Sequence, residues 1–154
     1  MTVGFGFDIH RLAPDRRLVL GGVTIPHPKG LLGHSDGDVV LHALIDALLA
    51  AAGQDDIGSR FPDTDPKYAG ISSEVLLAKV MDDLRPSWNV VNADVTVVAE
   101  EPKIAPHRAA IRSRIASHLG TERVTIKGKT MEGLGPIGAR EAIAAYAIVQ
   151  LEAS

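Results

Sequence analysis

Three side chains in the first third of the chain are of the types that bind a divalent metal ion. Asp8 and His10 stand one residue apart at the end of a short apolar segment, and His42 follows in a later apolar segment. Two imidazoles and one carboxylate leave a coordination position open, as in catalytic zinc sites. Alternate residues of a strand point to the same side, so Asp8 and His10 can reach one ion. A strand-end carboxylate beside a surface histidine is the simpler interpretation, and the metal hypothesis therefore depends on His42.

Acidic residues surround His42 at helical spacing. Asp38, His42 and Asp46 stand four residues apart, which places them on one face of a helix. A neighbouring carboxylate could accept the second ring N–H of a metal-binding histidine. Asp38 also suits a helix N-terminus through the helix dipole, a role that needs no ligand. His34 and Ser35 precede this helix, and Ser35 could cap it, contact a phosphate, or do both.

Three other polar segments are either binding loops or ordinary connections. Residues 55–58 and 61–66 are rich in carboxylates and turn residues, so they could hold sugar hydroxyls, although polar turns alone explain them. Residues 100–107 contain two prolines and form a stiff loop whose backbone could bind the edge of a base. Thr130 and Glu132 follow a predicted strand, and the carboxylate of Glu132 could hold a hard cation such as Mg²⁺.

Composition limits the classes of protein that the sequence can encode. The 154 residues carry a formal net charge of −3 and include no cysteine. Disulfides, thiolate metal sites and a cysteine nucleophile are therefore excluded, and bulk attraction to nucleic acid is disfavoured. No apolar run reaches the roughly 18 residues of a membrane helix, and no secretory signal is visible. We expect a single domain over residues 1–154 in the cytoplasm, without membrane or nucleic-acid partners.

The periodicity of apolar residues predicts the elements that must position these groups. Strands are expected over 2–8, 90–99 and 123–129, with a hairpin over 18–25 and a loop over 26–30. Residues 141–151 could form a buried strand or a short helix, and a strand is favoured. Helices are expected from 35 or 36 to 53, from 72 or 73 to 84, and from 106 to 120. This order predicts an α+β sandwich with helices on one face of a mixed sheet. The last strand is apolar on both sides, so an oligomer is expected to cover the other face.

Several motifs occur in one order and together resemble a known enzyme family, the 2-C-methyl-D-erythritol 2,4-cyclodiphosphate synthases of the non-mevalonate isoprenoid pathway. The motifs are Asp8-Ile9-His10-Arg11, His34-Ser35-Asp36-Gly37-Asp38 with His42, Asp56-Ile57-Gly58, Phe61-Pro62-Asp63-Thr64-Asp65-Pro66 and Pro102-Lys103. The resemblance covers essentially the whole chain. It implies a homotrimer of ferredoxin-like α+β subunits with active sites between subunits. It also implies a phosphorus–oxygen lyase that converts 4-diphosphocytidyl-2-C-methyl-D-erythritol 2-phosphate into the cyclic diphosphate and CMP.

The resemblance further implies roles for individual residues. Asp8, His10 and His42 would hold zinc, and Glu132 would hold Mg²⁺ or Mn²⁺ between the two phosphates of the cytidine diphosphate part. His34 and Thr130 would be the catalytic residues. The residues that would bind substrate are Asp8, His10, His34, Ser35, Asp56, Ile57, Gly58, Phe61, Pro62, Asp63, Thr64, Asp65, Ala99, Glu100, Glu101, Pro102, Lys103, Ile104, Ala105, Lys129, Thr130, Met131 and Glu132.

Two segments depart from the family pattern. The usual Thr-Thr-Glu run is here Lys129-Thr130-Met131-Glu132, and the usual Gly-Arg-Gly-Glu-Gly segment is Gly138-Ala139-Arg140-Glu141-Ala142. The family arginine, which helps to hold phosphate, is thus displaced from position 139 to Arg140, and one step along a strand reverses the direction of a side chain. The resemblance therefore leaves open the role of Arg140 and the binding of an isoprenoid diphosphate on the trimer axis.

Two other functions would use the same metal ligands. A metal-dependent phosphohydrolase would attack with metal-bound water and release linear products. A non-catalytic trimer that binds metal or nucleotide would leave the substrate unchanged. Neither alternative explains the segments 56–66 and 99–105, so the cyclase is the expected function.

Overall fold

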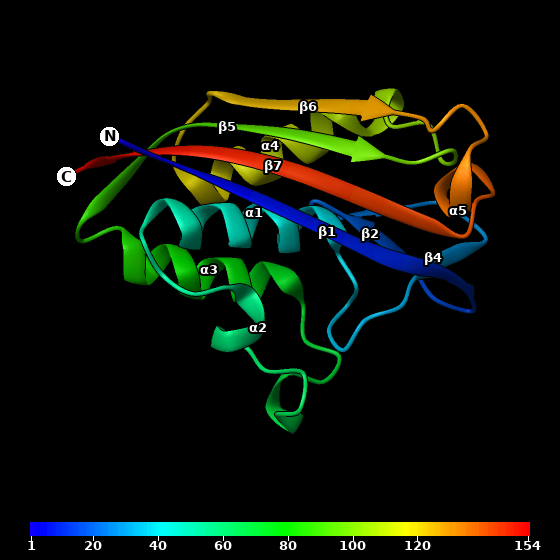
Figure 1. Ribbon diagram of the computed structural model, residues 1–154, viewed down its shortest axis with the longest axis horizontal. Helices are drawn as coiled ribbons and strands as arrows, with labels where there is room; N and C mark the ends of the chain where they lie inside the picture. The colour runs from blue at the N-terminus through cyan, green and yellow to red at the C-terminus, as the bar shows by residue number, and fades with distance from the viewer.

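The computed structural model describes residues 1–154 and contains a mixed five-stranded sheet in the order β4-β1-β7-β5-β6 (Figure 1). The strands are β1 (Thr2–Pro14), β4 (Lys29–Leu31), β5 (Trp88–Val98), β6 (Val124–Lys129) and β7 (Ala142–Ala153). Only β5 and β6 run parallel, whereas the other neighbours are antiparallel. The predicted mixed α+β architecture and the hairpin, formed by β2 (Leu18–Leu20) and β3 (Val23–Ile25), are confirmed. The loop prediction for 26–30 is wrong at its end, because residues 29–31 pair with β1.

Three longer helices, α1 (Val39–Ala51), α3 (Ser73–Leu84) and α4 (Arg108–Leu119), form the second layer of the molecule (Figure 1). Helices α1 and α4 contact the sheet, and α3 packs against both of them. The short helices are α2 (Ile57–Arg60) and α5 (Gly135–Gly138), and 3-10 turns lie at η1 (Pro66–Tyr68) and η2 (Ala105–His107). None of the helices combines the length and the apolar character that crossing a membrane requires.

The helix that carries His42 begins later than the sequence predicted. Asp38 is the N-cap of α1, and its carboxylate accepts a hydrogen bond from the Leu41 amide at 3.1 Å. The prediction that the helix starts at residue 35 or 36, with Ser35 as a possible cap, is wrong. Gly37 explains the delay, because its φ of 75° lies in the left-handed region that a right-handed helix cannot use. The predicted cap of α3 is confirmed at Ser72, whose hydroxyl accepts from the Glu74 amide.

Strand β1 lies unusually close to α1, and two glycines make this possible. A Cβ atom at Gly4 would lie 1.9 Å from the carbonyl oxygen of Ala47, and a Cβ at Gly6 would lie 1.9 Å from that of Ala43. The strand and the helix backbone are therefore in direct contact at these positions. The next inward-facing residues of β1 are Asp8 and His10, so the same close approach brings them to the first turn of α1.

The two faces of the sheet differ in what covers them. A core of 37 buried residues fills the space between the sheet, the helices and the hairpin. On the opposite face, large apolar side chains of β1 and β7 are exposed, and we call this set the open apolar face: Val3, Phe5, Phe7, Ile9, Tyr146 and Ile148. The Phe7 and Tyr146 rings pack against each other across the two strands, with centroids 5.0 Å apart and planes tilted by 42°. The open apolar face is continuous along both strands.

Candidate metal centre and adjoining cavities

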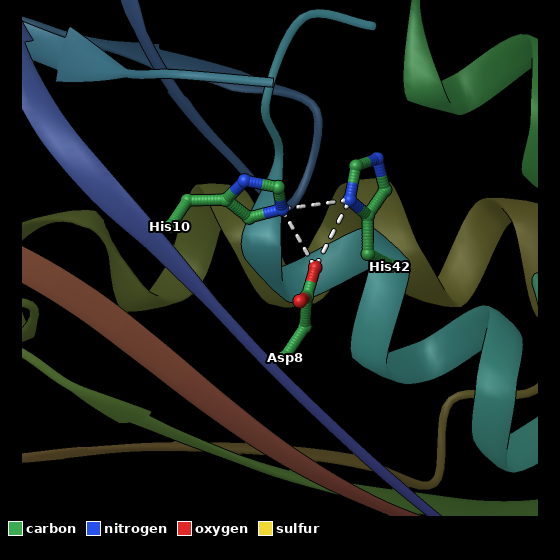
Figure 2. A group of neighbouring side chains, drawn as sticks. All are labelled: Asp8, His10 and His42. Carbon is green, nitrogen blue, oxygen red and sulfur yellow. Dashed lines mark hydrogen bonds and ion pairs between the residues drawn. The ribbon is translucent and has the colours of Figure 1, made fainter. Parts of the chain in front are cut away.

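Asp8 and His10 on β1 meet His42 on α1, as Figure 2 shows. The Asp8 Oδ2 atom lies 2.7 Å from His10 Nε2 and 3.1 Å from His42 Nδ1, and the two ring nitrogens are 3.1 Å apart. These atoms form a small triangle in which each residue offers one ligand atom to a common point. The three residues that the sequence predicted as metal ligands are thus brought together.

The electrostatics of this cluster suit a cation. Burial alone would raise the pKa of the Asp8 carboxyl, but hydrogen bonds and charge from His10 and His42 outweigh burial and hold that pKa well below its usual range. Burial would lower the pKa of His10, but its hydrogen bond and attraction to Asp8 raise it instead. Asp8 is therefore an ionised carboxylate between two imidazoles. Two nitrogen donors and one oxygen donor with an open position match the ligand set of catalytic zinc.

Contacts on the outer side of each ring orient the two histidines. The Nδ1 atom of His10 lies 2.6 Å from the carbonyl oxygen of Leu32, which can only accept, so Nδ1 carries the proton and Nε2 faces the cluster. The Nε2 atom of His42 lies 2.9 Å from the Ser73 hydroxyl and 3.0 Å from the Ser35 hydroxyl. The prediction that a carboxylate on the α1 face, from Asp38 or Asp46, accepts this ring proton is therefore wrong.

Asp38 and Asp46 hold backbone segments instead. The fully buried Asp38 carboxylate accepts from the amides of Gly21 at 2.9 Å and Gly22 at 2.7 Å, and so fastens the hairpin turn to the start of α1. Burial raises the pKa of Asp38 to about 6, although these backbone hydrogen bonds oppose the shift. Asp46 accepts from the Ile57 amide at 2.8 Å. It thereby ties α1 to the loop that contains residues 56–58.

A cavity of about 400 Å³ opens beside the metal cluster. Eight residues of the sequence-based prediction line it, together with three that the sequence analysis missed, namely Gly33, Tyr68 and Leu76; the eight are His10, His34, Ser35, His42, Ile57, Gly58, Phe61 and Asp63. The other predicted residues of this region, Asp56, Pro62, Thr64 and Asp65, belong to the surrounding loops but do not line the cavity. His34 Nε2 lies 3.1 Å from the Asp65 carbonyl oxygen and so joins the segment before α1 to the loop of residues 61–66.

A second cavity of about 220 Å³ lies where the parallel strands β5 and β6 end. Its lining contains two residues that were not predicted, Arg108 and Gly128, and seven that were: Ala99, Pro102, Lys103, Ile104, Ala105, Lys129 and Thr130. It shares no lining residue with the first cavity. Within one chain, the two sets of predicted binding residues therefore form separate sites.

The remaining predicted residues form the rim of the second cavity. The Glu100 carboxylate accepts from the amides of Met131 at 3.0 Å and Gly133 at 2.9 Å, and so joins the loop after β5 to the loop after β6. Glu132 adopts a left-handed φ of 52° within this loop. The hydrogen bonds from Glu100 place Met131 and Glu132 next to the segment 99–105.

Arg140 occupies a turn rather than an extended strand position. Its φ is 62°, and its guanidinium forms an ion pair with the Glu101 carboxylate at 3.3 Å. The argument that one step along a strand reverses the side chain therefore does not apply, because β7 begins only at Ala142. The structure directs Arg140 towards the loop after β5.

The fold and the site define an α+β protein in which a strand and a helix bring together one aspartate and two histidines that could hold a metal ion. The YgbB family model matches residues 1–152, and the chain belongs to this family. It is 54% identical to the 2-C-methyl-D-erythritol 2,4-cyclodiphosphate synthase of Syntrophomonas wolfei over 99% of both chains. It is 56% identical to the enzyme of the same name from Symbiobacterium thermophilum over 96% of both chains. The family resemblance drawn from the motifs is confirmed.

Solved structures agree with this assignment. The bifunctional IspDF of Campylobacter jejuni superposes with a TM-score of 0.95 at 41% identity, and the chain spans 99% of its own length but 42% of that protein. A 2C-methyl-D-erythritol-2,4-cyclodiphosphate synthase in its CDP-bound form gives a TM-score of 0.87 at 41% identity over 97% of this chain and 99% of that one. The complex of IspF from Plasmodium falciparum with CDP gives a TM-score of 0.87 at 34% identity, over 99% of this chain and 96% of that one.

Proposed function

We propose that the chain converts 4-diphosphocytidyl-2-C-methyl-D-erythritol 2-phosphate into 2-C-methyl-D-erythritol 2,4-cyclodiphosphate and CMP in non-mevalonate isoprenoid biosynthesis. This reaction makes it a phosphorus–oxygen lyase. The observation that carries the proposal is the Asp8, His10 and His42 cluster, which opens into a cavity lined by His34, Ser35 and Asp63. The relatives that share more than half of the sequence over nearly its full length bear the name of this enzyme.

The reaction is intramolecular, so the chain needs no nucleophile of its own. The 2-phosphate oxygen of the substrate attacks the β-phosphorus, and CMP leaves with the α-phosphorus. Zinc bound by Asp8, His10 and His42 would polarise a β-phosphate oxygen, and Mg²⁺ or Mn²⁺ at Glu132 would neutralise charge on the leaving group. The protein's own contribution is to hold the two reacting phosphates of one molecule close together and in line.

Each cavity has the chemistry of one half of this substrate. The larger cavity offers His34, the Ser35 hydroxyl and Asp63 to the methylerythritol phosphate, and Ile57 and Gly58 also line it. The smaller cavity offers residues 99–105 to the cytosine, and the Lys129 ammonium and Thr130 hydroxyl to the phosphates. We assign His34 and Thr130 the catalytic role of stabilising charge in the transition state.

The separation of the two cavities favours an active site built from two chains. We propose a homotrimer of ferredoxin-like subunits, each a single domain over residues 1–154, in which the larger cavity of one subunit meets the smaller cavity of its neighbour. The open apolar face supports this assembly, because exposed aromatic and aliphatic side chains on two adjacent strands are a surface that association would bury. A cytoplasmic location and the absence of nucleic-acid and membrane partners stay predictions.

Phosphorus NMR of the reaction mixture tests the proposed function. The protein with Zn²⁺ and Mg²⁺ should turn the cytidylyl substrate into the cyclic diphosphate and CMP, and His42→Ala should abolish this conversion. His27→Ala is the matched control, because the His27 ring hydrogen-bonds only to the backbone of Lys29. Linear phosphate products would favour a phosphohydrolase, and unchanged substrate under all metal conditions would favour a binding protein.

A further inference from the structure

Ser73 is a fully buried polar residue that the proposed mechanism does not use. It is the first residue of α3, yet the helix is capped by Ser72. Its hydroxyl lies 2.9 Å from His42 Nε2 and 2.5 Å from Asp36 Oδ1, and its amide donates to Asp36 Oδ2 at 3.1 Å. Ser73 therefore stands between a metal-binding histidine and a carboxylate, and neither sequence motif nor helix capping accounts for it.

We infer that Ser73, oriented by Asp36, is a positioning residue that fixes the tautomer and direction of the His42 ring. The inference rests on the proposed metal centre at Asp8, His10 and His42. The first residue of α3 would thus orient a metal-binding histidine, although no residue of α3 reaches the metal ligand atoms.

Counting protons along the three groups gives the direction of each hydrogen bond. The single hydroxyl proton of Ser73 is donated to Asp36 Oδ1. The Ser73 oxygen must then accept from His42 Nε2, which has to carry the ring proton. The lone pair of His42 is consequently on Nδ1, the nitrogen that faces Asp8 and His10. In the opposite tautomer, Nε2 would face the lone pairs of Ser73 at 2.9 Å, and only the Ser35 hydroxyl at 3.0 Å could donate to it.

The two histidines are thus held in opposite tautomers by different partners. His10 donates from Nδ1 to the Leu32 carbonyl and presents Nε2, whereas His42 donates from Nε2 to Ser73 and presents Nδ1. A backbone carbonyl fixes the first ring, and a hydroxyl fixes the second. A hydroxyl can donate as well as accept, so only the Asp36 carboxylate makes the second arrangement unambiguous.

This arrangement also releases Ser35 for the substrate. The Ser35 hydroxyl lies 3.0 Å from His42 Nε2 and 3.3 Å from the Ser73 hydroxyl, so it competes for the same ring proton. With that ring proton donated to Ser73, the hydroxyl of Ser35 keeps its own proton, which it can donate to the Ser73 oxygen or into the cavity that Ser35 lines. Ser73 and Ser35 therefore divide two tasks between them: one orients the metal ligand, and the other is available to a phosphate oxygen.

Zinc affinity of the metal-free protein, measured by competition with a chromophoric chelator, tests the inference. Ser73→Ala should weaken zinc binding about 10–100-fold, the range found when a partner of a metal-binding histidine is lost. Ser72→Ala is the matched control, because it removes the cap of α3 but no contact with His42, and it should bind zinc as tightly as wild type. Wild-type affinity in Ser73→Ala would overturn the inference, and so would an equal loss in both variants.

Nitrogen NMR of histidine-labelled wild-type protein decides the tautomer without any substitution. In the zinc-loaded protein and in the metal-free protein over a pH series, neutral His42 should carry its proton on Nε2 and neutral His10 on Nδ1. A proton on Nδ1 of neutral His42 would overturn the inference. Wild-type protein that binds no zinc would instead overturn the proposed metal centre, and the metal-free spectra would still show whether Ser73 orients the ring.

Discussion

Replacing Gly6 with alanine should both destabilise the protein and damage the metal centre. The added Cβ would lie 1.9 Å from the Ala43 carbonyl oxygen and 2.8 Å from the Ala47 amide nitrogen, whereas real Cβ atoms essentially never approach closer than 3.0 Å. Both obstacles are backbone atoms, so no side chain can rotate away. Helix α1 must therefore move from β1 by roughly 1 Å, which a close-packed interior accommodates poorly.

The loss of stability in Gly6→Ala can be estimated from this displacement. Overpacking of a core typically costs about 1–3 kcal/mol, and an obstacle made of backbone places Gly6→Ala at about 3 kcal/mol or more. For a chain of this length, that loss lowers the melting temperature by roughly 6–12 °C. His42 directly precedes Ala43, so its ring moves with the helix. A metal-binding side chain must be held to within about 0.5 Å of its working position, so the zinc affinity of Gly6→Ala should fall as well.

Thermal unfolding by calorimetry and zinc titration of the same samples are the assays. Gly4→Ala should lose similar stability, because its Cβ would lie 1.9 Å from the Ala47 carbonyl oxygen, but it should keep more zinc affinity since that clash lies more than one helical turn beyond His42. Gly58→Ala is the control, because its Cβ would meet only an Asp56 oxygen at 3.6 Å. A melting temperature of Gly6→Ala within about 2 °C of wild type would refute the packing argument.

Three further substitutions have defined outcomes. Burial raises the pKa of Asp38 from 3.8 to about 6, so the folded protein binds this proton more tightly than the unfolded chain, and the contribution of Asp38 to stability falls as the pH rises between these values. Asp38→Asn should remove this component from urea unfolding curves measured across that range, and an unchanged pH profile would contradict the assignment. Asp46→Ala leaves the Ile57 amide without its acceptor, which costs about 1–2 kcal/mol. KM for the cytidylyl substrate should therefore rise on the order of tenfold, with kcat less affected. Asp46→Asn keeps an acceptor, so its KM should rise less. Glu132→Gln should raise the Mg²⁺ concentration for half-maximal activity on the order of tenfold while zinc affinity stays unchanged, and a parallel loss of zinc affinity would count against a separate second ion site.

Local pattern was enough to predict most elements of this fold. Alternating apolar residues predicted β5, a continuous apolar run predicted β7, and β6 was also predicted as a strand. The helical period with Gly53 and Gly120 predicted the ends of α1 and α4. The extent of β1 was underestimated, because residues beyond position 8 gain their strand conformation from pairing with β7 and β4, which lie far away in the sequence. The start of α1 was misplaced because the left-handed conformation of Gly37, and the contact of Asp38 with the hairpin, cannot be derived from the local sequence.

The metal cluster was predictable, and the groups that orient it were not. Asp8 and His10 are two residues apart on one strand, and the type and spacing of both residues are visible in the sequence. Ser73 carried only the weaker signal of two adjacent serines at a helix start, of which one caps the helix and the other is left for a different role. That it meets His42 depends on how α3 packs against α1, a contact between residues far apart in the chain.

The most direct test of the proposed function is to restore zinc to the metal-depleted protein at saturating Mg²⁺ and to follow cyclic diphosphate formation by phosphorus NMR. The metal centre of Asp8, His10 and His42 predicts that activity returns in proportion to added zinc and levels off at one equivalent per chain. Asp8→Ala should show no such recovery. Cyclisation at full rate without zinc, or recovery that does not depend on Asp8, would contradict the central role of this centre.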